Sequence, residues 1–230
     1  GKAEKICVVS DSNVFPLYGQ KVLSSLEQAG FNVTSFVFPA GEPSKNGETL
    51  LSLLNTLACA QLTRSDLMVA LGGGVVGDLA GFAAACYLRG IRFVQVPTTL
   101  LAAVDSSVGG KTAIDLAAGK NLAGAFWQPS LVLCDPDCLN TLAPEVWADG
   151  LAEAIKYGMI ADANLLEQLC NNGLEKDPER IIARCIQLKA LAVEADERDF
   201  GERQKLNFGH TAGHSVEKHS NFTITHGHGV

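Results

Sequence analysis

The first 205 of the 230 residues contain no histidine, and all five histidines of the chain lie between positions 206 and 230. No uninterrupted apolar run reaches the ~20 residues of a membrane-spanning helix, so we expect no membrane insertion. Lys and Arg number 18 against 25 Asp and Glu, and this net charge of -7 argues against general nucleic-acid binding, which needs a basic surface. Internal repeats and low-complexity tracts are also absent.

Disulfides and a secretion signal are not indicated either. Seven cysteines, an odd number without a repeated metal-binding spacing, are expected to be reduced and mostly buried thiols. Cys134 and Cys138 flank a strand end and are a weak candidate for metal binding. The N-terminal residues GKAEKICVVSD lack the apolar core and cleavage site of a signal peptide, so we expect a cytoplasmic location.

The chain has the composition of a globular protein with a substantial core, since 47% of its residues are hydrophobic and 19% are charged. Apolar runs alternate with helix-periodic segments in its first part, which predicts an α/β fold: a mostly parallel sheet with helices on both faces. Such sheets bind ligands at the carboxyl ends of their strands. The predicted strands are 5–10, 32–38, 67–72, 92–96 and 131–135, and the predicted helices are 14–29, 45–61 and 76–88.

The character of the sequence changes after Pro144. Residues 144–161, 163–172 and 178–196 all show helical patterns, and no strand pattern returns. We therefore predict two domains, an α/β domain of residues 1–143 and an all-helical domain of residues 144–230.

Residues 72–77, GGGVVG, satisfy the GxGxxG pattern after a predicted strand and before a helix, where backbone amides can hold a pyrophosphate. The next strand ends at VPTT without the acidic residue that would bind a ribose, so a tight turn that needs glycine for positive φ is the alternative. Residues 108–112, VGGKT, resemble the end of a P-loop. Asp105 stands where the upstream glycine should be, so we reject a nucleoside triphosphatase.

The histidine segment is the candidate metal site. His210 and His214 are four residues apart, which places both imidazoles on one face of a helix, and His226 and His228 follow in a glycine-flanked loop. Imidazole is a common zinc ligand, and catalytic zinc sites usually add a carboxylate and leave one coordination position open. This segment alone does not identify the carboxylate.

Six motifs together resemble the 3-dehydroquinate synthase family, in the family's order and over nearly the whole chain. They are GGGVVGDLAGF (72–82), YLRG (87–90), VPTTLLAAVDSSVGGKTAID (96–115), GKN (119–121), GLAEAIKYG (150–158) and LNFGHTAGH (206–214). The resemblance implies a Rossmann-like NAD-binding domain followed by a helical zinc- and substrate-binding domain, with the active site in the cleft between them. Family members have further helices after the segment that matches HGHGV, so we expect this sequence to be part of a longer polypeptide.

The resemblance implies that Glu153, His210 and His226 are ligands of a zinc ion, for which cobalt could substitute. His214 would then be a catalytic or substrate-contacting residue. For His228 two roles stay open: it supports the metal site from outside the ligand group, or it is an ordinary loop residue.

The resemblance also implies contacts to NAD and to the substrate. The residues expected to bind NAD are Asp11, Glu42, Lys45, Gly73, Gly74, Asp78, Thr98, Thr99, Asp105, Lys120 and Thr141. Those expected to contact a seven-carbon keto acid phosphate are Arg89, Lys111, Asn121 and Asn207 near its phosphate, Lys189 and Arg203 near its carboxylate, and Lys156 near a hydroxyl. Several cations suit such an anion, because guanidinium and ammonium groups pair strongly with oxyanions.

The implied reaction converts 3-deoxy-D-arabino-heptulosonate 7-phosphate to 3-dehydroquinate and phosphate, a step of the shikimate pathway to aromatic amino acids. It combines oxidation, phosphate elimination, reduction, ring opening and aldol closure, and it regenerates NAD. Three alternatives stay open: a sibling sugar-phosphate cyclase, a metal- and NAD-dependent polyol dehydrogenase, and an inactive fragment that only binds metal or a partner. The family suggests a homodimer, in which Arg89 could act across the interface.

Overall fold

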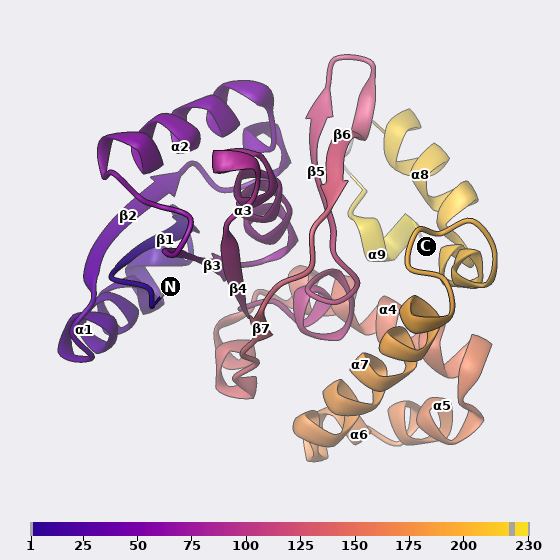
Figure 1. Cartoon of the computed structure of the whole chain (residues 1–230). Helices are drawn as coiled ribbons and strands as arrows, with labels where there is room; N and C mark the ends of the chain where they lie inside the picture. The colour runs from indigo at the N-terminus through magenta and orange to yellow at the C-terminus, as the bar shows by residue number, and fades with distance from the viewer. Residues whose placement is uncertain (1, 221–223, 230) are drawn as a thin grey trace. The chain divides into compact units, whose positions relative to one another are not determined.

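A computed structural model describes residues 2–220 and 224–229, except the side chains of residues 214, 217 and 218. The chain divides into two compact units (Figure 1). Gly1–Thr98 and Gly110–Asp135 form the first, called here the sheet unit, and Thr99–Gly109 and Pro136–Val230 form the second, the helical unit. The predicted boundary between 143 and 144 lies eight residues after the observed one between Asp135 and Pro136, and residues 99–109, predicted in the first domain, belong to the helical unit.

The sheet unit contains a five-stranded parallel sheet of order β2-β1-β3-β4-β7, which confirms the predicted α/β architecture. Each of the first four strands begins at the residue predicted for it. The strands are β1 (Lys5–Asp11), β2 (Asn32–Phe38), β3 (Leu67–Gly72), β4 (Arg92–Pro97) and the short β7 (Leu131–Val132).

Alternate side chains of the central strands fill two separate cores, because successive residues of a strand point to opposite faces. On β1, Cys7 and Val9 belong to the larger core, whereas Ile6 and Val8 belong to the smaller one. The larger core includes residues of α2 (Gly47–Cys59) and α3 (Gly74–Cys86), and the smaller one includes residues of α1 (Gln20–Gln28), which follows a π-helical turn at Phe15–Gly19. The central strands β1 and β3 are therefore buried on both faces, as expected inside a parallel sheet.

An antiparallel hairpin of β5 (Lys111–Leu116) and β6 (Gly119–Phe126) was not predicted. Its strands are rich in small residues, so the usual β-branched and aromatic signal is weak. Contact with α3 compensates, since a Cβ on Gly81 would meet the side chains of Thr112 and Phe93. Tertiary packing, which sequence periodicity does not report, supports this hairpin.

The helical unit confirms the predicted all-helical second part. Its helices are α4 (Pro144–Ala161), α5 (Ala163–Cys170), α6 (Gly173–Lys176), α7 (Pro178–Ala195), α8 (His210–His219) and α9 (His226–Gly229), with 3-10 turns at Pro136–Thr141 and Glu202–Asn207. The carboxylates of Asp162 and Asp177 cap the N-termini of α5 and α7. The segment predicted as a loop around His226 is instead the single helical turn α9.

A π-helical turn at Ala102–Ser106 packs against α4 and α7 inside the helical unit. Gly150 of α4 permits this contact, because a Cβ there would come within 2.5 Å of Leu100 and of the backbone of Leu101. This packing places residue 105 next to the side chains of α4 and α7.

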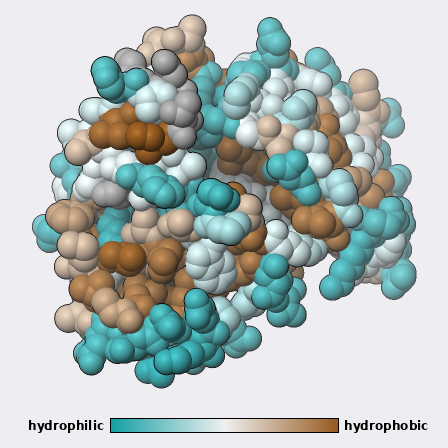
Figure 2. Space-filling model, turned by 180° about the vertical axis from the view of Figure 1, so that it is seen from behind, coloured by the Kyte–Doolittle hydropathy of each residue, from teal (hydrophilic) through white to brown (hydrophobic). Residues whose placement is uncertain are grey.

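On the face shown in Figure 2, hydrophobic side chains form patches that are bounded by hydrophilic residues. Exposed apolar side chains include Met159 at 57% and Leu191 at 59% of full exposure. Within the described part of the chain, every helix is too short or too polar to span a lipid bilayer. None of the seven cysteines, all in the described part of the chain, forms a disulfide, as predicted. Cys59, Cys86 and Cys170 are exposed, so the expectation of mostly buried thiols was wrong.

A candidate metal centre in the helical unit

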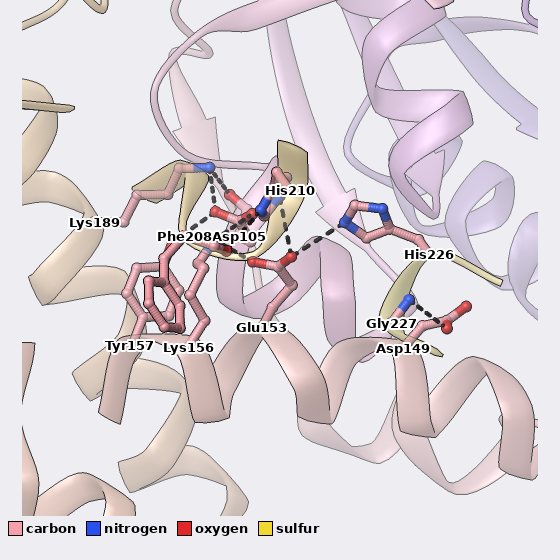
Figure 3. Close-up of polar contacts among 10 residues, drawn as sticks. All are labelled: Asp105, Asp149, Glu153, Lys156, Tyr157, Lys189, Phe208, His210, His226 and Gly227. Atoms are coloured by element: carbon pink, nitrogen blue, oxygen red, sulfur yellow. Dashed lines mark hydrogen bonds and ion pairs between the residues drawn. The ribbon is translucent and has the colours of Figure 1, made fainter. Parts of the chain in front are cut away.

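Three helices of the helical unit bring Glu153, His210 and His226 together (Figure 3). Glu153 lies in the middle of α4 and is fully buried, while His210 and His226 are the first residues of α8 and α9. The Nε2 atoms of His210 and His226 lie 3.4 and 3.1 Å from Oε1 of Glu153. Among the described residues, this is the one group of three or more potential ligands whose donor atoms lie within 4.8 Å of one another.

The orientation of His210 favours a cation at this point. Its Nδ1 lies 3.1 Å from the carbonyl oxygen of Phe208, so Nδ1 carries the proton and donates to that oxygen. Burial lowers the pKa of His210, and the nearby Glu153 charge only partly offsets this effect. The lowered pKa keeps the ring neutral near pH 7. The unprotonated Nε2 and the carboxylate of Glu153 then direct lone pairs at each other, an arrangement that a metal ion would stabilise.

The ligand spacing fits zinc. Ligand atoms at about 2.0–2.2 Å from a tetrahedral ion lie roughly 3.3 Å apart, close to the two separations above. Two imidazoles and one carboxylate also leave a fourth position for a water or substrate oxygen, the pattern of catalytic zinc sites. The residues present therefore fit the metal that the sequence predicts.

A network of charged groups adjoins the three ligands (Figure 3). Lys156, one turn after Glu153 on α4, pairs with the Glu153 carboxylate and lies 3.7 Å from Oδ2 of Asp105. Lys189 of α7 donates to both the carboxylate and the backbone oxygen of Asp105, at 2.5 and 2.7 Å. Both lysines are buried, so they hold positive charge where water screens it weakly.

Asp105 is the centre of this network. Partial burial alone would raise its pKa, but the charges of Lys189 and Lys156 and the hydrogen bonds from Lys189 and Tyr157 hold the pKa well below its ordinary value. The Tyr157 hydroxyl donates to Oδ1 of Asp105 at 2.6 Å. Burial, and next the Asp105 charge, raise the pKa of Tyr157, so this hydroxyl stays protonated and acts as a donor.

Arg203 is a further buried cation, 2% exposed, in the turn that precedes α8. Its guanidinium donates to the carbonyl oxygens of Gly109 and Glu197, at 3.0 and 2.7 Å. Carbonyl groups orient the guanidinium without neutralising it. Gly109 has φ +97°, and a Cβ there would collide with the Arg203 guanidinium and with Val193, so both its conformation and this contact require glycine.

Other predicted residues of the helical unit have local roles or are exposed. The Thr99 hydroxyl accepts from the backbone N–H of Ala102, and the Thr141 hydroxyl donates to the carbonyl of Cys138. Asn207 is exposed at the end of its 3-10 turn. The side chain of His214 lies outside the described part of the structure. His228 is exposed, and its Nδ1 lies 2.7 Å from the Thr225 hydroxyl, so it belongs to the turn of α9 rather than to the ligand group.

In the sheet unit, the glycine-rich loop joins β3 to α3. Gly73 occupies the N-cap with φ -80° and no side-chain cap, which leaves backbone N–H groups of the first turn available for an anion. The alternative explanation of this motif, a tight turn that needs glycine for positive φ, was wrong, because none of Gly72, Gly73, Gly74 and Gly77 has positive φ. The glycines permit close packing instead, since a Cβ on Gly77 would lie 2.5 Å from the Gln95 side chain.

Thr98, the first residue after β4, is also placed for a ligand. Its Oγ1 is buried and makes no hydrogen bond to any described residue. A buried hydroxyl without a partner is unfavourable, and a bound polar group would relieve that cost. This orphaned atom and the uncapped helix fit the predicted cofactor.

A second charged cluster in the sheet unit surrounds Lys45, which is 4% exposed. Its ammonium lies 2.6 Å from the Asp78 carboxylate, 2.5 Å from Oδ1 of Asn121 and 3.9 Å from Glu42, which in turn lies 3.7 Å from Lys120. Burial alone would lower the pKa of Lys45, but the charges of Asp78 and Glu42 raise it above the ordinary value. The structure therefore brings five of the predicted residues together here.

Three further residues predicted to contact ligands belong to the sheet unit. The carboxylate of Asp11 accepts from the backbone N–H groups of Asn13 and Val14, at 2.8 and 2.9 Å, and so closes the turn after β1. Arg89 is exposed and, with φ +67°, follows another left-handed residue, Leu88 at φ +51°. Lys111 is exposed at the start of β5.

Comparison with known proteins decides the family. The 3-dehydroquinate synthase N-terminal model matches residues 35–149, and the 3-dehydroquinate synthase C-terminal model matches residues 150–230. The chain belongs to the 3-dehydroquinate synthase family. A 3-dehydroquinate synthase of Clostridium botulinum is 50% identical over 100% of this chain and 67% of its own length. Across the first curated relatives, the chain spans 64–67% of their length.

Solved structures of related cyclases share the fold. ValA, a 2-epi-5-epi-valiolone synthase from Streptomyces hygroscopicus subsp. jinggangensis 5008 with NAD+ and Zn2+ bound, matches with a TM-score of 0.89 at 29% identity, over 98% of this chain and 65% of its own. A 2-deoxy-scyllo-inosose synthase complexed with carbaglucose-6-phosphate, NAD+ and Co2+ matches with a TM-score of 0.87 at 28% identity, over 98% and 64%. Both of these similar structures therefore hold NAD+ and a metal ion, Zn2+ in one and Co2+ in the other.

Sequence reasoning missed two residues that adjoin the candidate metal ligands, Tyr157 and Asp149. Both lie on α4, four residues after and four residues before Glu153, so the three side chains share one helix face. The carboxylate of Asp149 accepts a hydrogen bond from the backbone N–H of Gly227 at 2.8 Å. The four-residue spacing around the glutamate was the signal that could have found them.

Proposed function

We propose that the protein acts as a 3-dehydroquinate synthase, a phosphate-eliminating lyase that converts 3-deoxy-D-arabino-heptulosonate 7-phosphate to 3-dehydroquinate with catalytic NAD and zinc. One observation carries the proposal: Glu153, His210 and His226 meet beside three buried cations in a chain of this family. A metal alone would suit many reactions. A metal next to several cations suits an oxygen-rich anion.

We assign Glu153, His210 and His226 as the residues that hold the metal. When bound, zinc would lower the pKa of a coordinated substrate hydroxyl, and NAD would supply a reversible hydride acceptor. The protein's own contribution is orientation. The Phe208 carbonyl sets the tautomer of His210, and Lys156 sits against the glutamate, close enough to contact a neighbouring substrate hydroxyl.

Lys189 and Arg203 are the proposed carboxylate contacts. Asp105 orients Lys189, while the carbonyl groups that hold Arg203 leave its charge available for a substrate. Desolvated cations bind oxyanions strongly because little water competes. The proposed phosphate contacts of Arg89, Lys111, Asn121 and Asn207, and those of the predicted NAD-binding residues, rest on the family resemblance.

A sibling sugar-phosphate cyclase is the second candidate. It is favoured by a solved structure of similar fold, a 2-deoxy-scyllo-inosose synthase complexed with carbaglucose-6-phosphate, NAD+ and Co2+. The difference lies in the substrate carboxylate. The two buried cations Lys189 and Arg203 favour the carboxylate-bearing substrate.

The test is phosphate release from the seven-carbon keto acid phosphate with NAD at a small fraction of the substrate concentration. We expect many equivalents of phosphate per NAD and no net NADH. Glucose 6-phosphate and a heptulose phosphate without a carboxylate serve as parallel substrates, and preferred turnover of either would favour the sibling cyclase. NADH that accumulates in proportion to substrate would indicate a polyol dehydrogenase.

Location and assembly are part of the proposal. We expect a cytoplasmic homodimer with no nucleic-acid or membrane partner, and size-exclusion chromatography with light scattering tests the dimer.

A further inference from the structure

Asp149 connects two ligands of the proposed metal site. It lies one helical turn before Glu153 on α4, and its Oδ1 accepts a hydrogen bond from the backbone N–H of Gly227 at 2.8 Å (Figure 3). Gly227 directly follows His226 in the chain. One face of a single helix therefore carries a metal ligand and the group that holds the backbone beside a second ligand.

The turn that carries His226 needs such an anchor. The helix α9 spans four residues, and a helix this short does not hold its shape by itself. Its backbone approaches α4 so closely that a Cβ on Gly227 would lie 2.9 Å from Oδ1 and 3.0 Å from the backbone oxygen of Asp149. Glycine at position 227 permits this approach, and the hydrogen bond fixes its direction.

We propose that Asp149 is a positioning residue for His226. Its carboxylate fixes the backbone next to His226. As a result, Nε2 of His226 stays 3.1 Å from Oε1 of Glu153, close to the separation of two ligands of one zinc ion. Groups that orient metal ligands in this way contribute strongly to metal affinity without touching the metal. The inference rests on the proposed metal site and adds to it the residue that holds one ligand in place.

The test measures zinc affinity of the whole chain by competition with a chromogenic chelator. Asp149→Ala should weaken zinc binding about tenfold to a hundredfold, the usual range for loss of such a partner. Glu145→Ala is the matched control: it removes the same charge from the same helix four residues earlier, at an exposed position. We expect this control to bind zinc as the wild type does.

Two conservative variants separate position from charge and remain informative if the alanine variant does not fold. Asp149→Asn keeps an acceptor oxygen in the same place and loses the charge, whereas Asp149→Glu keeps the charge and displaces the oxygen. Asn should stay within about threefold of the wild type, and Glu should lose more affinity than Asn. The reverse order would overturn the proposal, because a merely electrostatic effect would favour Glu.

A double-mutant cycle shows whether Asp149 acts through His226. In a His226→Ala background, the change Asp149→Ala should cost less than about twofold in zinc affinity, because no ligand is left to position. An equal loss in both backgrounds, or an Asp149→Ala protein with the affinity of Glu145→Ala, would overturn the inference. Failure of the wild type to bind zinc would instead reject the metal site itself, so the two failures are distinguishable.

Discussion

The two units use buried polar groups differently. In the sheet unit, apolar side chains fill both faces of the sheet, and buried charges such as Lys45 and Asp66 lie at the ends of elements. In the helical unit, Glu153, Lys156 and Lys189 are buried around Asp105 in one connected network. Burying charge is costly unless each group is paired.

This difference indicates where the chemistry lies. A connected network of buried charges contributes little net stability compared with apolar packing, so it is expected where a ligand or a reaction uses it. We infer that the sheet unit contributes most of the free energy of unfolding. The helical unit contributes less, because its site requires buried charged groups. The following predictions test this contrast.

The largest expected effect comes from Glu153→Ala. The Glu153 carboxylate lies next to both imidazoles, so its removal should abolish zinc binding and turnover. NAD binding should stay largely intact, because Glu153 is not among the residues predicted to bind NAD. Zinc content by elemental analysis and NAD affinity by fluorescence titration check this expectation. Full zinc occupancy in the variant would reject the ligand assignment.

Arg203→Leu should raise KM for the keto acid phosphate roughly tenfold to a hundredfold and change KM for NAD by less than about threefold. A desolvated guanidinium is a strong contact for a carboxylate, and leucine cannot replace it. Steady-state kinetics measure both constants. Arg184→Leu, which removes a more exposed arginine paired with Asp162 in the same unit, is the control. An unchanged substrate KM in Arg203→Leu would reject the proposed carboxylate contact.

Tyr157→Phe should lower the free energy of unfolding by about 1.5–3 kcal/mol, because it removes a hydrogen bond to the charged Asp105. The matched change in the sheet unit is Tyr87→Phe, whose hydroxyl donates to the neutral carbonyl of Leu62 at 2.9 Å and should contribute only about 0.5–1.5 kcal/mol. Urea unfolding measures both. Equal losses would contradict the contrast between the two units.

The smallest effect concerns acid stability of the sheet unit. Burial alone would raise the pKa of Asp66, but hydrogen bonds from the backbone N–H groups of Lys5, Thr63 and Glu4 hold it at about 2. A carboxylate with a lowered pKa stabilises the fold above its unfolded pKa of about 4, and this contribution is lost as the pH falls from about 4 to 2.

Asp66→Asn should therefore be about 1–2 kcal/mol less stable than the wild type at pH 6, and the difference should shrink towards pH 3. Thermal unfolding across this range measures the change. A difference that does not depend on pH would show that the Asp66 charge contributes nothing.

Much of the fold could be predicted from the sequence because its local signals agree with the tertiary structure. The observed β2 and β3 coincide with the predicted 32–38 and 67–72, and α4 coincides with 144–161. The β5–β6 hairpin was missed because its small residues form strands through contact with α3. Likewise, the short helix at His226 depends on contacts with α4 and α8, which spacing in the sequence does not reveal.

The candidate site was predictable to a similar degree. The family resemblance named Glu153, His210 and His226, and the structure brings these three together. The role of Asp105 was less accessible: the resemblance grouped it with the NAD contacts, whereas in the structure it pairs with Lys189 and accepts from Tyr157. Which groups pair in a core depends on rotamers and helix packing, and these are set only when the chain folds.

X-ray absorption spectroscopy of the zinc-loaded protein tests the central claim most directly. We expect one zinc per chain, nitrogen and oxygen ligands at about 2.0–2.1 Å, the outer-shell scattering of two imidazoles, and no sulfur. A zinc–sulfur distance of about 2.3 Å would place the metal at cysteines instead of at Glu153, His210 and His226, and would contradict the account.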